Sequence, residues 1–190
     1  MAEVEEVEVR SRAELRAWLA EHHARPERVW LVFWKKHTDH YTPIGELISE
    51  LLCWGWVDAV TRGVDADRSS VRVAPRRARS AWSAVNKAKV EEARAAGLMM
   101  APGEAAIARA KENGMWSFLD DVERLEVPPD LARALDAASA ARAVWEDYPR
   151  SVKRGMLEFI KTAKTPETRA KRIEALAEDA AAGLRPRNFR

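Results

Sequence analysis

The residues best suited to chemistry are cations that gather around a tryptophan between Asp67 and Glu91. No acidic residue interrupts this stretch, which holds Arg68, Arg72, Arg76, Arg77, Arg79, Lys87 and Lys89. Guanidinium groups bind carboxylates and phosphates through paired hydrogen bonds, and the indole of Trp82 offers a flat face for stacking. Residue types in this pattern predict a site for an anion.

The predicted site joins a strand that carries Asp58 to the turn and helix start that follow the arginines. Arg76 and Arg77 would supply charge, and Trp82 a stacking face. If Ser80 caps the next helix, the free N–H groups and positive dipole end of that helix add to the attraction. Phosphate, a nucleotide, a carboxylate metabolite and a nucleic-acid backbone are candidate anions. The predicted ligand-binding residues are Asp58, Arg76, Arg77, Trp82, Ser83 and Asn86.

Two other interpretations of these residues stay open. The arginines also fit a solvated turn that pairs with Asp58, Asp65 or Asp67, because such surface ion pairs are common. Alternatively, Asp58 acts as a general base and Arg76 as an electrostatic stabiliser in an enzyme for a small anionic substrate. The chain lacks a Gly-rich phosphate loop, a serine nucleophile elbow, a CxxC pair and an HExxH motif. We therefore favour a non-enzymatic protein without a cofactor.

The histidines and the single cysteine do not predict a metal site or a reactive thiol. His37 and His40 lie in one loop with Asp39, but no further His or Cys completes a set of three or four ligands. His22 and His23 end a helix. Cys53 lies on an apolar helical face, where a thiol usually serves as inert filler, and one cysteine forms no intramolecular disulfide.

Composition narrows the class of partner and the compartment. The formal net charge is +2, with 32 basic and 30 acidic residues, so anion binding must come from local clustering and nucleic acid is not expected. The first ten residues are acidic and lack an apolar segment, and no apolar run approaches a membrane span. We expect a cytoplasmic protein without membrane insertion, whose partner is a small anionic ligand or another protein. The oligomeric state stays open.

Periodicity in the first half predicts a β-α-β-α-β-β order. Strands are expected near residues 7–9, at 29–34, at 56–61 and at 70–74, the last two joined as a hairpin. Ser11 with Glu14 forms a capping box for a first helix, and Thr42 with Pro43 begins a second, which ends near Gly55. The fold class is α+β: a small mixed sheet of about four strands with helices on one side, followed by an all-helical C-terminal half.

The second half is predicted to be helical, at residues 80–96, 102–112, from 128 past 145, 151–163 and 165–183. Acidic and proline residues at 119–129 indicate a connector. We expect an α+β body at 1–118, a helical unit at 128–183 packed on it, and a frayed tail at 184–190.

Several segments, in their order along the chain, resemble the YdeI/OmpD-associated family, also described as bacteriocin-protection proteins. The most specific are Trp82-Ser83-x-x-Asn86 and Ala163-Lys164-x-Pro166-Glu167-Thr168-Arg169. The resemblance implies a role in resistance to antimicrobial peptides and an association with a porin, and it carries no catalytic residues. The family has been linked to the periplasm, whereas this N-terminus predicts no export.

Three hypotheses follow. The first is a cytoplasmic, non-enzymatic stress or bacteriocin-resistance protein that binds an anionic ligand or partner. The second is the enzyme with Asp58 as base. The third is a protein-interaction module that uses its C-terminal helices.

Overall fold

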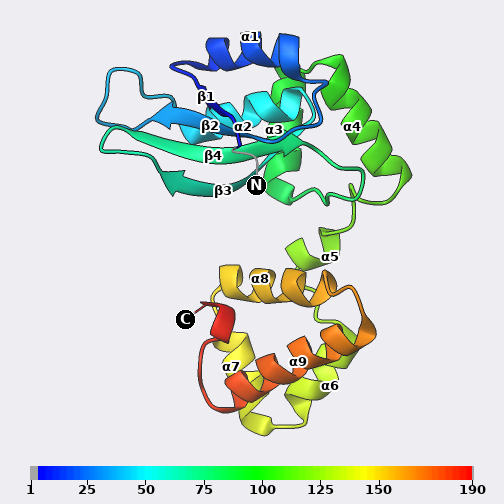
Figure 1. The fold of residues 1–190 in the computed structure, drawn as a ribbon. Helices are drawn as coiled ribbons and strands as arrows, with labels where there is room; N and C mark the ends of the chain where they lie inside the picture. The colour runs from blue at the N-terminus through cyan, green and yellow to red at the C-terminus, as the bar shows by residue number, and fades with distance from the viewer. Residues whose placement is uncertain (1–3, 190) are drawn as a thin grey trace. The chain divides into compact units, whose positions relative to one another are not determined.

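The computed structural model describes residues 4–189, which divide between Phe118 and Leu119 into two compact units. The first unit holds the strands and the second is helical, as Figure 1 shows. The predicted α+β class, with a small mixed sheet early in the chain, is confirmed.

The sheet of the first unit has the strand order β1-β2-β4-β3. β1 (Glu6–Glu8) pairs in parallel with β2 (Val29–Trp34), because α1 (Arg12–His22) carries the chain back between them. β3 (Trp56–Gly63) and β4 (Arg68–Pro75) form the predicted antiparallel hairpin, and β4 also pairs antiparallel with β2. The register of β3 shifts between Asp58 and Thr61, which places Asp58 beside an irregularity in the strand.

Helices cover one face of this sheet and form the main core with it (Figure 1). α1, α2 (Ile44–Cys53) and α3 (Ala84–Ala95) each contribute buried side chains, and α4 (Ala101–Glu112) packs against α2. The cap predicted for α1 is confirmed, since the Ser11 hydroxyl accepts a hydrogen bond from the backbone N–H of Glu14 at 3.1 Å. α2 ends as predicted at Gly55, whose φ of +74° suits a residue without Cβ.

The opposite face of the sheet is built from arginines that stack on tryptophans. The Arg62 guanidinium lies 4.0 Å from the ring centroid of Trp30 and donates to the Glu6 carboxylate at 2.6 Å. Arg68 lies over Trp34 and donates to Glu8. Arg68, one of the cations that the sequence places near the predicted site, is therefore paired within the sheet.

The second unit is a set of short helices around α9. Its elements are α5 (Asp120–Glu123), α6 (Pro129–Asp136), α7 (Ser139–Asp147), α8 (Arg150–Lys161) and α9 (Pro166–Ala181), with a 3₁₀ turn at Arg187–Phe189. α6, α7 and α8 all contact α9. The Thr165 hydroxyl caps α9 by accepting from the backbone N–H of Thr168, as its Thr-Pro-Glu start predicts.

Three predicted element boundaries are wrong. The helix predicted at residues 80–96 begins at Ala84 with Ser83 as its cap, because the preceding loop is held in the core at Trp82. Pro43, not Thr42, is the cap residue of α2. The helix predicted from 128 past 145 is broken at Ala138, whose extended backbone lets α6 and α7 each reach α9.

The C-terminal segment also differs from the frayed tail that we predicted. The hydroxyl of Tyr148 donates to the carbonyl of Leu184 at 2.5 Å, and Asp179 accepts the backbone N–H of Arg187 at 2.9 Å. Pro186 is buried, and the ring of Phe189 fills the space above Gly155, which has no Cβ. Residues 184–189 are thus a packed part of the second unit. Arg190 lies outside the described residues.

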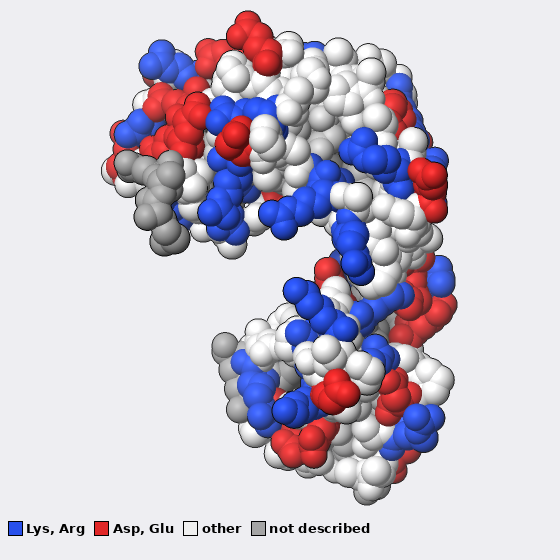
Figure 2. Space-filling view, turned by 45° about the vertical axis from the view of Figure 1, so that its right-hand side comes forward, with Lys and Arg blue, Asp and Glu red and all other residues white. Residues whose placement is uncertain are grey.

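Among the described helices, none combines the length and the apolar character that a membrane crossing needs. Figure 2 shows several Lys and Arg side chains lying close together along one edge of the first unit, while Asp and Glu gather elsewhere on that view. Positive charge is therefore clustered locally in a chain whose net charge is close to zero.

Candidate anion-binding site

Arg76 is positioned by the end of β4 and by the turn between α2 and β3. It follows Pro75, the last residue of β4, and its backbone N–H donates to the carbonyl of Gly55 at 2.8 Å. Its side chain folds back under the loop that leads to α3, where Nη1 donates to the carbonyl of Ala81 at 2.9 Å. The side chain is 6% exposed, which is rare for an arginine.

The guanidinium of Arg76 stacks on the indole ring of Trp82. The Arg76 guanidinium carbon lies 3.8 Å from the Trp82 ring centroid, a close cation–π contact. The Trp82 side chain is fully buried and packs with Leu52, Val90 and Ile107, and its ring tilts against that of Trp116. Our prediction that Trp82 presents an open stacking face is therefore wrong, because Arg76 and the core cover the indole.

Three donors of this stacked pair have no hydrogen-bond partner within the described chain. They are Nε and Nη2 of Arg76 and Nε1 of Trp82, and all three are buried. Buried donors are nearly always paired in native proteins, because an unpaired one costs about 1–3 kcal/mol. Nε and Nη2 lie along the same edge of the planar guanidinium, an edge at which a carboxylate or phosphate binds through two parallel hydrogen bonds. This vacant fork is the chemical feature that defines the site.

Burial lowers the pKa of Arg76 from its ordinary value to about 10, and the nearby negative charge of Asp58 opposes this shift. Arg76 still carries its charge at neutral pH. The direction shows that its surroundings disfavour a positive charge more than water does. An anion at the fork would act in the opposite direction and raise this pKa.

Asp58 is half-buried on β3 and acts on Arg76 through its charge. The only hydrogen bond of the Arg76 guanidinium within the described chain goes to Ala81, so Asp58 does not close the fork. Asp58 therefore offsets part of the buried charge and leaves the two donors free.

The structure gives the remaining predicted residues other places. Arg77 is exposed beside the buried Arg76. The Ser83 hydroxyl accepts from the backbone N–H of Asn86 at 3.3 Å and so caps α3. Of the six predicted residues, Arg76 and Trp82 are in contact and Asp58 acts on Arg76 by its charge. Ser83 and Asn86 pair with each other at the start of α3, and Arg77 is exposed.

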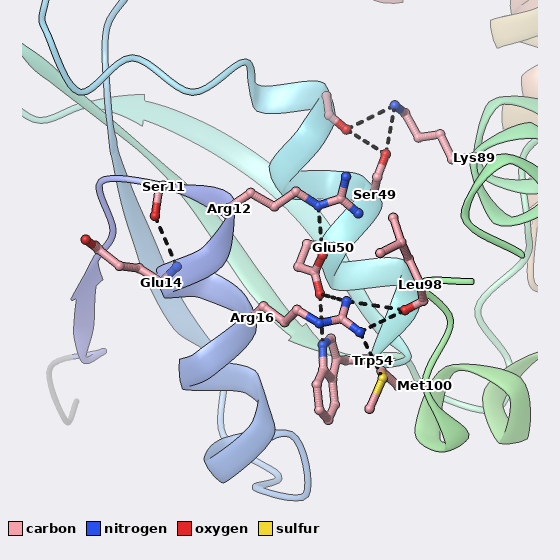
Figure 3. A network of polar contacts seen from close by, with 11 residues as sticks. Ser11, Arg12, Glu14, Arg16, Ser49, Glu50, Trp54, Lys89, Leu98 and Met100 are labelled. Atoms are coloured by element: carbon pink, nitrogen blue, oxygen red, sulfur yellow. Dashed lines mark hydrogen bonds and ion pairs between the residues drawn. The ribbon is translucent and has the colours of Figure 1, made fainter. Parts of the chain in front are cut away.

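Glu50 is a second buried charge, and sequence reasoning missed it. Its carboxylate is 1% exposed on α2 and accepts hydrogen bonds from Arg12 at 2.8 Å, Arg16 at 2.7 Å and Trp54 at 3.0 Å (Figure 3). Arg16 also donates to the carbonyl of Leu98. The signal in the sequence is that Glu50 lies three residues after Leu47 and four before Trp54, on the inward stripe of α2, while Arg12 and Arg16 share one face of α1.

Cys53 and His37, whose side chains could serve a thiol or metal site, lie in different surroundings. Cys53 is buried, and desolvation raises the pKa of its thiol, which keeps it protonated. His37 contacts the carboxylate of Asp67 at 3.0 Å. Among residues 4–189, no group of three or more His, Cys, Asp and Glu side chains has the arrangement of a metal site.

These observations define a protein with an α+β unit that holds a buried, incompletely paired arginine, and with a helical unit after it. A family model described as Domain of unknown function (DUF8412) matches residues 7–106, more than half of the chain. The chain belongs to this family.

A second family model, described as Bacteriocin-protection, YdeI or OmpD-Associated, matches residues 124–183. The predicted resemblance is confirmed by this match, which covers the helical unit and the Ala163–Arg169 segment. The Trp82–Asn86 segment lies within the range of the first model instead. No curated protein and no solved structure matches the chain.

Proposed function

We propose that this protein acts in bacteriocin protection by binding an anionic group at Arg76 and Trp82 in the cytoplasm, without catalysing a reaction. The association with bacteriocin protection is supported by the family match in the helical unit. The anion site is supported by the vacant fork of Arg76.

The observation that carries the proposal is the contrast between two buried charges in the same unit. Glu50 has three donors around its carboxylate, and its interactions are complete. Arg76 is nearly as buried, yet only one of its three guanidinium nitrogens donates a hydrogen bond within the described chain. The other two, Nε and Nη2, have no partner there. Removing an ionic group from water costs several kcal/mol unless a partner compensates. A bound carboxylate or phosphate would supply both the charge and the two acceptor oxygens.

The stacked indole explains why the fork can stay in one orientation. The guanidinium plane stacks on the Trp82 ring, and the carbonyl of Ala81 accepts a hydrogen bond from Nη1. The side chain therefore loses little further conformational freedom when an anion binds, which favours affinity at a small site. Trp82 Nε1 is a further buried donor without a partner in the described chain.

A binding titration with inorganic phosphate and with acetate tests the site. We expect either anion to raise the unfolding temperature in proportion to the logarithm of its concentration above Kd, with a stabilisation of about 2.7 kcal/mol when its concentration is about 100 times Kd. The expected spectroscopic signature is a shift of the Arg76 Nε–H and Trp82 Nε1–H proton signals. Arg76→Met should abolish both effects and still fold, because it removes two unpaired buried donors and keeps an apolar chain on Trp82.

Arg77→Met is the matched control, since this neighbouring arginine is exposed and should leave binding unchanged. Stabilisation by the anion that persists unchanged in Arg76→Met would show that the anion binds elsewhere, and the proposed site would be wrong. In cells challenged with a bacteriocin, Arg76→Met should lose protection while Arg77→Met keeps it. Equal survival of cells carrying the two variants would show that protection does not depend on the anion site.

A further inference from the structure

The second unit contains a cavity of about 240 Å³ between α8, α9 and the C-terminal segment. It shares no residue with the Arg76 site. Four apolar side chains, Met156, Phe159, Leu176 and Pro186, form much of its lining. Met156 and Leu176 belong to the buried core of the unit, so the apolar part of the cavity is continuous with that core.

Three cations surround this apolar interior, and one carboxylate accompanies them. Lys171, Arg172 and Arg187 line the cavity together with Asp179. The Asp179 carboxylate is occupied, because it accepts the backbone N–H of Arg187 at 2.9 Å and the Arg187 Nε at 3.3 Å. Lys171 is exposed and has no ion pair within the described chain. The lining therefore carries a surplus of positive charge.

The walls of the cavity are held in place by several independent contacts. Arg172 stacks on Phe159, with its guanidinium carbon 3.9 Å from the ring centroid, and also donates to the Phe159 carbonyl. The C-terminal wall is attached through Tyr148, Asp179 and the ring of Phe189 on Gly155. Because these side chains are already fixed, ligand binding costs little additional conformational entropy.

We propose that this cavity binds a small amphiphile, with an apolar body against Phe159 and Leu176 and one anionic group near Lys171. Its volume exceeds that of engineered cavities of about 150 Å³ that hold benzene, and it falls below the pockets of about 300 Å³ and more that hold drug-sized molecules. A single ring or a short alkyl chain fits this range. The surplus of cations selects the negative headgroup.

Titration with octanoate, followed by the backbone amide signals of Arg172, Ala175 and Leu176 in a two-dimensional NMR spectrum, tests this proposal. We expect saturable shifts at these signals. Octylamine, which has the same chain and the opposite charge, should produce none, and 1-octanol should bind more weakly than octanoate. Signals of the first unit report separately on any carboxylate binding at Arg76.

Two variants separate the charge from the cavity. Lys171→Gln should weaken octanoate binding about threefold to tenfold, since it removes one partly solvated charge. Ala175→Trp should abolish binding by filling the cavity, and Ala175→Leu serves if the larger side chain prevents folding. Lys164→Gln removes an exposed cation that does not line the cavity and should change nothing.

Three results would overturn the proposal. They are octylamine binding as well as octanoate, octanoate binding that survives a folded cavity-filling variant, and the absence of saturable shifts in the second unit.

Discussion

At the scale of single residues, the first unit buries the charged side chains of Glu50 and Arg76, and the two differ in how fully they are paired. Glu50 lies between two helices, where Arg12 and Arg16 from α1 reach its carboxylate. Both arginines remain about one-third exposed, so their charges keep some contact with water. Arg76 lies in a loop whose groups offer it one carbonyl. The ion pairs of Glu50 join α1 to α2, whereas Arg76 keeps two donors that can bind an anion.

Glu50→Gln should lower the free energy of unfolding by about 3 kcal/mol, because it removes the charge that Arg12, Arg16 and Trp54 share inside the protein. Denaturant unfolding followed by tryptophan fluorescence measures this change. Glu46→Gln, at an exposed position in the first turn of the same helix, is the control and should cost less than about 1 kcal/mol. Equal costs for the two variants would show that the Glu50 network is not structural.

At the scale of elements, α2 and α4 approach each other unusually closely. The carbonyl of Cys53 at the end of α2 accepts the backbone N–H of Met100, just before α4 begins. A Cβ on Gly103 would lie 2.2 Å from that same carbonyl oxygen. Gly55, at the turn after α2, meets the carbonyl of Pro102 in a similar way. Glycine at these positions sets the spacing of the helices around the base of the Arg76 loop.

Gly103→Ala should therefore destabilise the protein by about 2 kcal/mol or more, since neither backbone can move without disturbing the core. Gly45→Ala is the matched comparison, because Gly45 also lies in the first turn of a helix but its nearest neighbour would be the flexible end of Lys89 at 3.5 Å. That variant should be neutral or stabilising by up to about 1 kcal/mol. Thermal unfolding of both variants measures the difference, and a harmless Gly103→Ala would contradict the close approach.

The elements themselves were predictable where a local signal specifies them. Ser11 with Glu14, Thr165 with Pro166, and Gly55 all act within a few residues, and the structure places helix ends at each. Ser80 was mistaken for a cap because Ser80 and Ser83 both precede the apolar pattern of α3. Ser83 is the cap because Trp82, which lies between the two serines in the sequence, is buried in the core, and this burial is a tertiary contact.

At the scale of the whole molecule, each of the two units buries apolar side chains of its own. The two buried clusters of the first unit draw their members from residues before Phe118. Leu131, Trp145, Ile160 and Leu176 are buried in the second unit. Each unit thus has the apolar burial that independent folding needs.

Fragments 1–118 and 119–190, expressed separately, should each fold cooperatively. Their amide NMR spectra should overlay on the corresponding signals of the full chain, except near the new termini. Collapse of the dispersed signals or aggregation of either fragment would show that its core depends on the other unit, as our sequence prediction of a helical unit packed on the body implies.

The sequence by itself determined the α+β class, the hairpin, most helix ends and the stretch of chain that holds the candidate site, because these depend on neighbours within a few residues. Only the tertiary structure decided which arginine is buried, that Trp82 lies under it rather than open to ligand, and that the C-terminal segment closes a cavity. Burial and hydrogen-bond pairing depend on segments far apart in the chain, and no local pattern specifies them.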